Sequence, residues 1–145
     1  MMARLIIFSG LPGTGKTSLA RPLARKLKFP LLRVDDLFEI IPAKTLAQAD
    51  SMWDELVGML LALVELQLEI GLSVVVDLVF MGEDRLAARK LAAEYGAGLL
   101  PIYTYVSDPA VWKRRVDQRV EDAPAEDEVA TWTSIQVQQR DFWPW

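Results

Sequence analysis

The stretch Gly10-Leu11-Pro12-Gly13-Thr14-Gly15-Lys16-Thr17 fits the pattern G-x-x-x-x-G-K-[ST], which is typical of phosphate-binding loops. The residues before it, 4–9, form a short apolar run rich in strand-forming side chains. The residues after it carry Leu19, Leu23 and Leu27 at helical spacing. The sequence therefore predicts a strand, a glycine loop and a helix, in the order that such a loop requires.

Each residue type in the loop has a physical reason. Glycines allow backbone angles and close approach that a Cβ would block, so successive N–H groups converge on phosphate oxygens at the start of a helix. Lys16 brings a mobile positive charge to the β- and γ-phosphates, and Thr17 offers a hydroxyl oxygen to Mg²⁺. The alternative is a Gly-Pro turn before a helix with a chance lysine. We therefore expect ATP and Mg²⁺ as cofactors, with the nucleotide bound by Gly10, Pro12, Gly13, Thr14, Gly15, Lys16, Thr17 and Ser18.

Composition limits the class of protein. A chain of 145 residues, of which 52% are hydrophobic, is expected to form one domain with a real core. The net charge of −4 argues against a nucleic-acid partner bound by charge alone. With no histidine and no cysteine, carboxylates are left to handle protons. The most apolar segment, residues 56–68, contains Glu65 and Gln67 and is too short to span a membrane; we expect a cytoplasmic protein, of unspecified oligomeric state.

The predicted elements alternate along the chain. We expect strands at 4–8, 31–34, 73–77 and 99–106 and helices at 15–27, 36–41, 46–70, 83–95, after Ser107 or Asp108, and at 125–140. Thr45 is the expected N-cap of the long helix, and Gly71 is expected to end it. Strands that alternate with helices predict an α/β fold with a parallel sheet.

Aspartates stand where two of the predicted strands end, which is where ligands bind in open parallel sheets. Asp35 is positioned to accept the proton of an attacking hydroxyl, although a solvated strand-end aspartate has the same sequence signature. Asp36, with Glu39 three residues later, has the spacing of a capping box, which favours a structural role. Asp77 is expected to hold Mg²⁺ opposite Thr17, with a turn aspartate as the alternative.

Arginines precede a polar stretch at residues 121–127. Arg115 and Arg119 are four residues apart and share a helix face, so they are candidates to stabilise charge on a transferred phosphoryl group. The alternative is a solvated face with ion pairs, because the same helix carries several acidic residues. Among the five tryptophans, Trp53 is the candidate for contact with a substrate.

The loop, the segment Arg33-Val34-Asp35-Asp36-Leu37-Phe38 and residues 71–80 together resemble small P-loop kinases related to chloramphenicol phosphotransferase, zeta-toxin-type kinases and gluconate kinase. The resemblance covers nearly the whole chain. It implies a P-loop NTPase three-layer sandwich with a parallel sheet in the order 2-3-1-4-5. It also implies Asp35 as the base that faces the acceptor hydroxyl, Lys16 and Thr17 as the phosphate and Mg²⁺ residues, and Arg115 or Arg119 as the lid arginine. The implied function is ATP-dependent transfer of the γ-phosphate to a hydroxyl of a small molecule, by one kinase-like domain over 1–145 with a lid near 115–127.

The sequence departs from this pattern at two places. Polynucleotide 5′-kinases carry an arginine three residues beyond the equivalent aspartate; Phe38 stands here, which argues against nucleic acid and favours an uncharged or apolar acceptor. Relatives also continue past a segment like 140–145 into a fifth strand. We therefore expect either a four-stranded sheet or a chain truncated at its C-terminus.

Other functions stay open at this point. A nucleotide-binding regulator or inactive relative without transferase activity has the same loop. A GTPase switch is less favoured, because no Asn-Lys-x-Asp segment and no Asp-x-x-Gly after the third strand is present, and an AAA-type motor is not expected of so short a chain.

Overall fold

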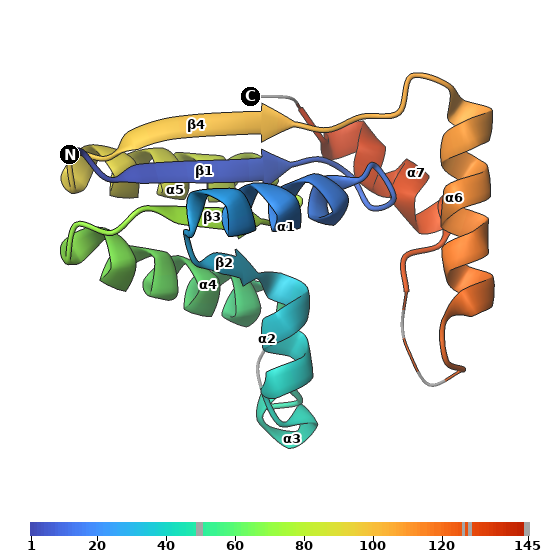
Figure 1. The fold of residues 1–145 in the computed structure, drawn as a ribbon. Helices are drawn as coiled ribbons and strands as arrows, with labels where there is room; N and C mark the ends of the chain where they lie inside the picture. Colours follow the sequence, from blue (N-terminus) through green and yellow to red (C-terminus); the bar gives the residue numbers. More distant parts are fainter. Residues whose placement is uncertain (49–50, 126, 128, 144–145) are drawn as a thin grey trace.

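The computed structural model, which describes residues 1–48, 51–125, 127 and 129–143, contains a parallel sheet flanked by helices (Figure 1). The four strands lie in the order β2-β3-β1-β4, as predicted. The α/β fold class is therefore confirmed. In chain order the elements are β1 (Arg4–Ser9), α1 (Lys16–Leu27), β2 (Leu31–Arg33), α2 (Val34–Ile40), α3 (Ala43–Leu46), α4 (Met52–Glu69), β3 (Val74–Asp77), α5 (Gly82–Glu94), β4 (Gly98–Tyr103), α6 (Pro109–Asp122) and α7 (Trp132–Asp141).

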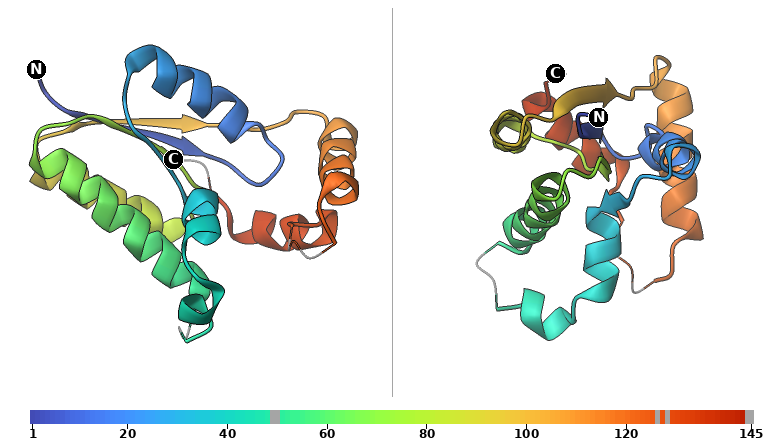
Figure 2. Two further views of the ribbon diagram at one scale, coloured as in Figure 1. Left: turned by 60° about the horizontal axis from the view of Figure 1, so that its bottom comes forward. Right: turned by 60° about the vertical axis from the view of Figure 1, so that its left-hand side comes forward.

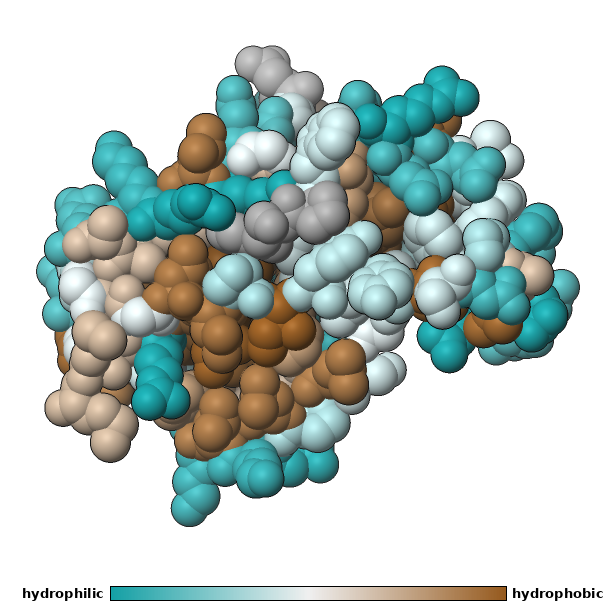
Figure 3. All heavy atoms as spheres, turned by 90° about the horizontal axis from the view of Figure 1, so that it is seen from above, coloured by the Kyte–Doolittle hydropathy of each residue, from teal (hydrophilic) through white to brown (hydrophobic). Residues whose placement is uncertain are grey.

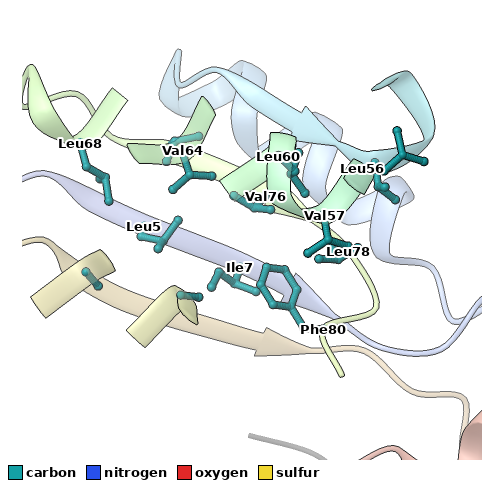
Figure 4. Close-up of a cluster of buried hydrophobic side chains, with 14 of the residues drawn as sticks. Leu5, Ile7, Leu56, Val57, Leu60, Val64, Leu68, Val76, Leu78 and Phe80 are labelled. Atoms are coloured by element: carbon teal, nitrogen blue, oxygen red, sulfur yellow. The ribbon is translucent and has the colours of Figure 1, made fainter. Parts of the chain in front are cut away.

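The central strand β1 buries side chains on both faces, as a strand inside a parallel sheet does. Leu5 and Ile7 point into the core formed with α4 and α5. Ile6 and Phe8 point to the opposite face, which α1 covers with Ala20 and Ala24. Figure 4 shows the larger core, in which Leu5 and Ile7 meet the side chains of α4. The layers are therefore helix, sheet, helix.

The long helix predicted over 46–70 is wrong at its start. A short helix, α3, begins after Pro42 and includes Thr45, so Thr45 is not an N-cap; residues 49–50 of the predicted helix lie outside the described residues. Ser51 caps α4 instead, because its hydroxyl accepts a hydrogen bond from the Asp54 N–H at 3.3 Å. The end of the helix is confirmed: Gly71, with φ of 77°, and the next residue bond back to the last turn.

Two further boundaries differ from the prediction. The strand predicted over 99–106 ends at Tyr103, and the chain then runs to Asp108, whose carboxylate caps α6. The helix predicted over 125–140 begins only at Trp132, because Thr131 and Ser134 form a capping box there. Of the polar stretch 121–127, the first two residues belong to α6, and Glu126 lies outside the described residues.

Two helical arms project beyond the carboxyl ends of the strands. One is α2 with α3, which follows β2, and the other is α6 with α7 (Figures 1 and 2). The second arm has its own core, which includes Leu11 of the glycine loop and Trp112, Val116 and Ile135 of the two helices. Phe142 fixes the end of α7, because its ring stacks on Tyr103 and lies under the Arg85 guanidinium. The arms therefore stand on either side of the loop after β1.

Strand β4 forms one edge of the described sheet. Figure 3 looks onto the molecule from above, where hydrophobic side chains gather; Leu100 on β4 is half-exposed. The N–H groups of Gly98 and Thr104 point toward β1, so by alternation the backbone of Pro101 faces outward. Proline has no N–H to offer there, which makes this edge a poor template for strand addition. Among the described residues, no helix has the length and apolar character that a membrane crossing requires.

The core predicts the cost of shortening a leucine of α4. Leu60 is fully buried, whereas Leu66 of the same helix is 54% exposed. Leu60→Ala should lower the free energy of unfolding by about 2–5 kcal/mol, because it removes buried surface and leaves a cavity. Leu66→Ala, the matched control, should change it by less than about 0.5 kcal/mol. Urea denaturation measures both, and equal losses would show that α4 does not pack as described.

Candidate functional site

The glycine loop lies at the carboxyl end of β1 and leads into α1, which begins at Lys16. Thr14 stabilises the loop: its hydroxyl donates to the Leu11 carbonyl at 2.7 Å and lies 2.8 Å from the Thr104 hydroxyl. A Cβ on Gly15, where φ is 95°, would have nothing within 4 Å. The backbone before α1 therefore faces open space, with room for a phosphate group at the helix N-terminus.

Gly10 does not face that space. A Cβ at Gly10 would come within 2.5 Å of the Thr104 carbonyl oxygen, and the residue is absent from the lining of the cleft described below. Its glycine is required by close packing between the loop and the chain after β4. The nucleotide contact expected of Gly10 stays a prediction; the other predicted loop residues line the cleft, namely Pro12, Gly13, Thr14, Gly15, Lys16, Thr17 and Ser18.

Helix α6 packs directly on the loop. The indole N–H of Trp112 donates to the Pro12 carbonyl at 2.9 Å. A Cβ at Gly13 would lie 2.9 Å from a methyl carbon of Val116. The indole of Trp112 also meets that of Trp132 on α7 edge-on, with ring centroids 5.0 Å apart. The arm that carries the predicted lid arginines is thus anchored on the loop itself.

Lys16 is directed back into the loop, where its ammonium group donates to the Leu11 carbonyl at 3.2 Å. Burial lowers the pKa of this lysine; Asp77 and Asp35 act in the opposite direction, and Arg119 and Arg33 add to the lowering. Both predicted carboxylates and one predicted arginine therefore act electrostatically on the same ammonium group.

Thr17 and Asp77, the two residues expected to hold Mg²⁺, are in direct contact. The Thr17 hydroxyl donates to Asp77 Oδ2 at 2.5 Å, and Asp77 is only 5% exposed. They offer two hard oxygen atoms, one from the first turn of α1 and one from the carboxyl end of β3. Together with phosphate oxygens and water they form the kind of donor set that Mg²⁺ prefers. In the described part of the chain, no group of three or more acidic, histidine or cysteine side chains could hold a metal by itself.

Asp35 and Asp36 both lie in the first turn of α2 and bind one arginine. Arg33, the last residue of β2, donates to Asp35 at 3.0 Å and to Asp36 at 2.7 Å. Its Nε donates to Asp77 at 3.3 Å. The predicted capping role of Asp36 is wrong, because the N-cap of α2 is Arg33 and Asp36 sits inside the helix. Sequence reasoning assigned no role to Arg33, although an arginine two residues before a strand-end aspartate was a visible signal.

A cleft of about 970 Å³ joins these groups. It is lined on one side by Asp35 and Trp53 and on the other by Arg115 and Arg119, with the loop between them. Trp53 is 40% exposed, as expected of a side chain available to a substrate. Sequence reasoning did not find the contribution of α7, whose Ser134 and Gln138 complete the lining. Trp145, another of the five tryptophans, lies outside the described residues.

The amino-acid sequence of this chain matches a known protein family. A sequence profile described as "AAA domain" matches residues 5–142. Among curated proteins, none matches the sequence.

Solved structures of kinases share the fold. A candidate kinase from Chloroflexus aurantiacus is 27% identical, with a TM-score of 0.71 over 86% of this chain and 72% of that one. The APS kinase of Mycobacterium tuberculosis, as a Cys556Ala mutant, is 27% identical, with a TM-score of 0.57 over 71% of this chain and 76% of that one. A gluconokinase from Sinorhizobium meliloti is 19% identical, with a TM-score of 0.60 over 97% of this chain and 75% of that one, and shows the fold alone.

The contact between the loop and α6 predicts the effect of a single methyl group. Gly13→Ala should destabilise the protein by about 1–3 kcal/mol, because the new Cβ meets Val116 and φ is 78° there. It should also weaken ATP binding, since the loop must shift. Gly58→Ala is the matched control: it lies within α4 with nothing near its Cβ, and should stabilise by up to about 1 kcal/mol. Urea denaturation and ATP titration test this; a Gly13→Ala variant as stable as wild type would contradict it.

Proposed function

Because this chain belongs to the AAA domain family and shares its fold with kinases, we propose that it is an ATP-dependent phosphotransferase acting on a hydroxyl of a small molecule. The observation that carries the proposal is the single cleft in which a phosphate-binding loop, an exposed carboxylate and two arginines face one another. A regulator that only binds a nucleotide requires the loop alone. Phosphoryl transfer also requires a base for the acceptor and positive charge near the transferred group, which the carboxylate and the arginines can provide.

The nucleotide side is assigned to the loop. We propose that the backbone of 13–16 and the Lys16 ammonium bind the β- and γ-phosphates, and that Thr17 and Asp77 hold Mg²⁺. When bound, Mg²⁺ would neutralise charge on the phosphate oxygens. A structure of the Mycobacterium tuberculosis APS kinase in complex with AMPPNP and APS, 24% identical to this chain, has a TM-score of 0.66 over 89% of this chain and 77% of that one. AMPPNP in that kinase supports a nucleotide as the ligand here.

The acceptor side is assigned to Asp35. Its side chain is 58% exposed at the cleft, so it is accessible to a substrate hydroxyl. As the acceptor oxygen attacks the γ-phosphorus, the bond from that phosphorus to the bridging oxygen breaks and ADP leaves. The hydroxyl proton passes to the Asp35 carboxylate. Arg115 and Arg119 face the same space and would stabilise charge on the phosphoryl group in transfer, as residues of a lid over 115–127.

The acceptor is proposed to be uncharged. Trp53 offers an aromatic surface in the same cleft as Asp35. Arg33, the cation closest to Asp35 along the chain, already binds three carboxylates. These observations, with Phe38 where an arginine would read a substrate phosphate, favour a neutral hydroxyl compound as the acceptor. The panel that tests this pairs neutral alcohols and sugars with their phosphorylated or carboxylated analogues, and measures ADP release from Mg-ATP. ADP release only with anionic acceptors would refute the charge assignment, and nucleotide binding without transfer to any acceptor would favour a regulator.

Mg-ATP should stabilise the folded protein. At a concentration one hundred times the dissociation constant, a ligand bound to the native state alone adds about 2.7 kcal/mol. Lys16→Ala should remove most of this gain, because the ammonium group no longer reaches the phosphates. Thermal unfolding with and without Mg-ATP measures both proteins. An undiminished gain in Lys16→Ala would refute the role of this lysine.

Removing the proposed base should separate binding from transfer. Asp35→Asn keeps the size and polarity of the side chain but cannot take a proton, so transfer should fall by roughly 10²–10⁴-fold. ATP affinity should change little, since the loop binds the nucleotide. Asp36→Asn, whose side chain does not line the cleft, is the matched control and should cost far less. Steady-state rates and nucleotide titration give both quantities; equal loss in the two variants would end the assignment.

A further inference from the structure

Arg33 joins three carboxylates that come from two different elements. It ends β2 and precedes α2, and its guanidinium lies between Asp35 and Asp36 of α2 and Asp77 at the end of β3. A different nitrogen serves each one: Nη2 to Asp35 at 3.0 Å, Nη1 to Asp36 at 2.7 Å and Nε to Asp77 at 3.3 Å. Its side chain is only 11% exposed, although Asp35 and Asp36 are open to solvent. A planar fork used in this way fixes its partners in direction as well as in distance.

The contacts continue from Arg33 to the loop helix. Asp77 accepts hydrogen bonds from Arg33 and from Thr17 on the same oxygen, Oδ2. The path Thr17, Asp77, Arg33, Asp35 therefore links the proposed metal side of the cleft to the proposed base on the acceptor side. Asp35 is mostly exposed, and its Arg33 contact is the one that ties it to the buried part of the site.

Charge explains why this position needs a cation. Three carboxylates gather around Arg33, and like charges at short distance repel one another. Without the guanidinium, Asp35 would be free to turn into solvent, where it is better hydrated. An ammonium group is a single point charge, so a lysine cannot reproduce three directed contacts.

We infer that Arg33 is a positioning residue, which holds Asp35 toward the acceptor and Asp77 toward Thr17 through one guanidinium; this inference rests on the proposed function. Arg33 acts through the two aspartates. Its donors are directed to carboxylates, so it does not serve as the receptor of an anionic substrate. A misplacement of about 1 Å in a reacting group costs on the order of 10²-fold in rate, which sets the expected size of the effect.

The first experiment compares rates of ADP formation from Mg-ATP, with water and with the neutral acceptors of the panel above. At saturating Mg-ATP, Arg33→Met should lower the rate by about 10²-fold, and the KM for Mg-ATP should rise by about tenfold because Asp77 also loses a partner. Arg33→Lys should recover only a small part of the loss. At saturating Mg-ATP, the double variant Arg33→Met with Asp35→Asn should be no slower than Asp35→Asn alone, because the effect of Arg33 on the transfer rate passes through Asp35 and its effect through Asp77 falls on the affinity for Mg-ATP. Arg25→Met, on the exposed face of α1, controls for the loss of one positive charge and should match wild type.

The second experiment needs no turnover. It measures the affinity for ATP in EDTA and in Mg²⁺ by titration of a fluorescent ATP analogue. Loss of Arg33 should leave the affinity in EDTA unchanged and reduce the gain from Mg²⁺ by about tenfold, since Asp77 loses a partner that orients it. Asp36→Asn keeps an oxygen that can accept from Arg33 and should retain most of the gain.

The outcomes separate the two proposals. A wild-type protein that forms no ADP with any acceptor overturns the proposed function, and the Mg²⁺ arm then decides on Arg33. An Arg33→Met variant that is folded by circular dichroism and keeps the wild-type rate and the wild-type Mg²⁺ gain overturns the role of Arg33. Additive losses in the double variant overturn the path through Asp35. If Arg33→Met does not fold, Arg33→Lys and the double variant Arg33→Lys with Asp35→Asn decide by the same criteria.

Discussion

Parallel pairing of β1 with β3 is the constraint on which the site depends. The register places Phe8 opposite Asp77, so Asp77 stands beside the point where β1 turns into the glycine loop. Because α1 begins directly after the loop, Thr17 returns to the same place and meets Asp77. The pairing of β2 with β3 then sets Arg33 opposite Asp77. Two register choices therefore bring together groups that are 60 and 44 residues apart in sequence. A shift of one residue would turn Asp77 to the other face of the sheet.

Local patterns carried the prediction of the sheet. The loop identified β1 and α1, and continuous apolar runs identified buried strands, so the strand order followed from the resemblance and is confirmed. The boundaries that failed lie where short polar side chains offer competing hydrogen bonds. Ser51 is the N-cap of α4, and Thr131 is the N-cap of α7, which therefore begins later than predicted. Such caps are worth about 1 kcal/mol each and are hard to rank from sequence, because Thr45 is also of a residue type favoured as an N-cap.

In the candidate site, the sequence identifies residues that have a recognisable pattern of their own. It does not identify residues whose role depends on contacts with several others. Lys16, Thr17, Asp35 and Asp77 each carry a sequence signal, and the structure brings all four to one cleft. Arg33 carries only a weak signal, its place two residues before a strand-end aspartate, because its importance lies in the distances to three carboxylates on two elements. Asp36 is the opposite case, a residue that fits a sequence pattern but does not have the predicted role. Its spacing to Glu39 satisfies the capping-box pattern, but a nearby buried guanidinium is a stronger partner for a carboxylate than a helix N-terminus.

The glycines of the loop show how one motif serves two purposes. At Gly15 nothing lies near the missing side chain, and the open space is available to a ligand. At Gly10 and Gly13 the space is already filled, by Thr104 and by Val116. These two positions bring the loop into contact with the chain after β4 and with α6, and the Trp112 hydrogen bond to Pro12 fixes the second contact. Consequently the helix that carries Arg115 and Arg119 is held against the loop at the turn of Trp112 and Val116. A phosphate bound at the loop and these two arginines are therefore positioned by the same contacts.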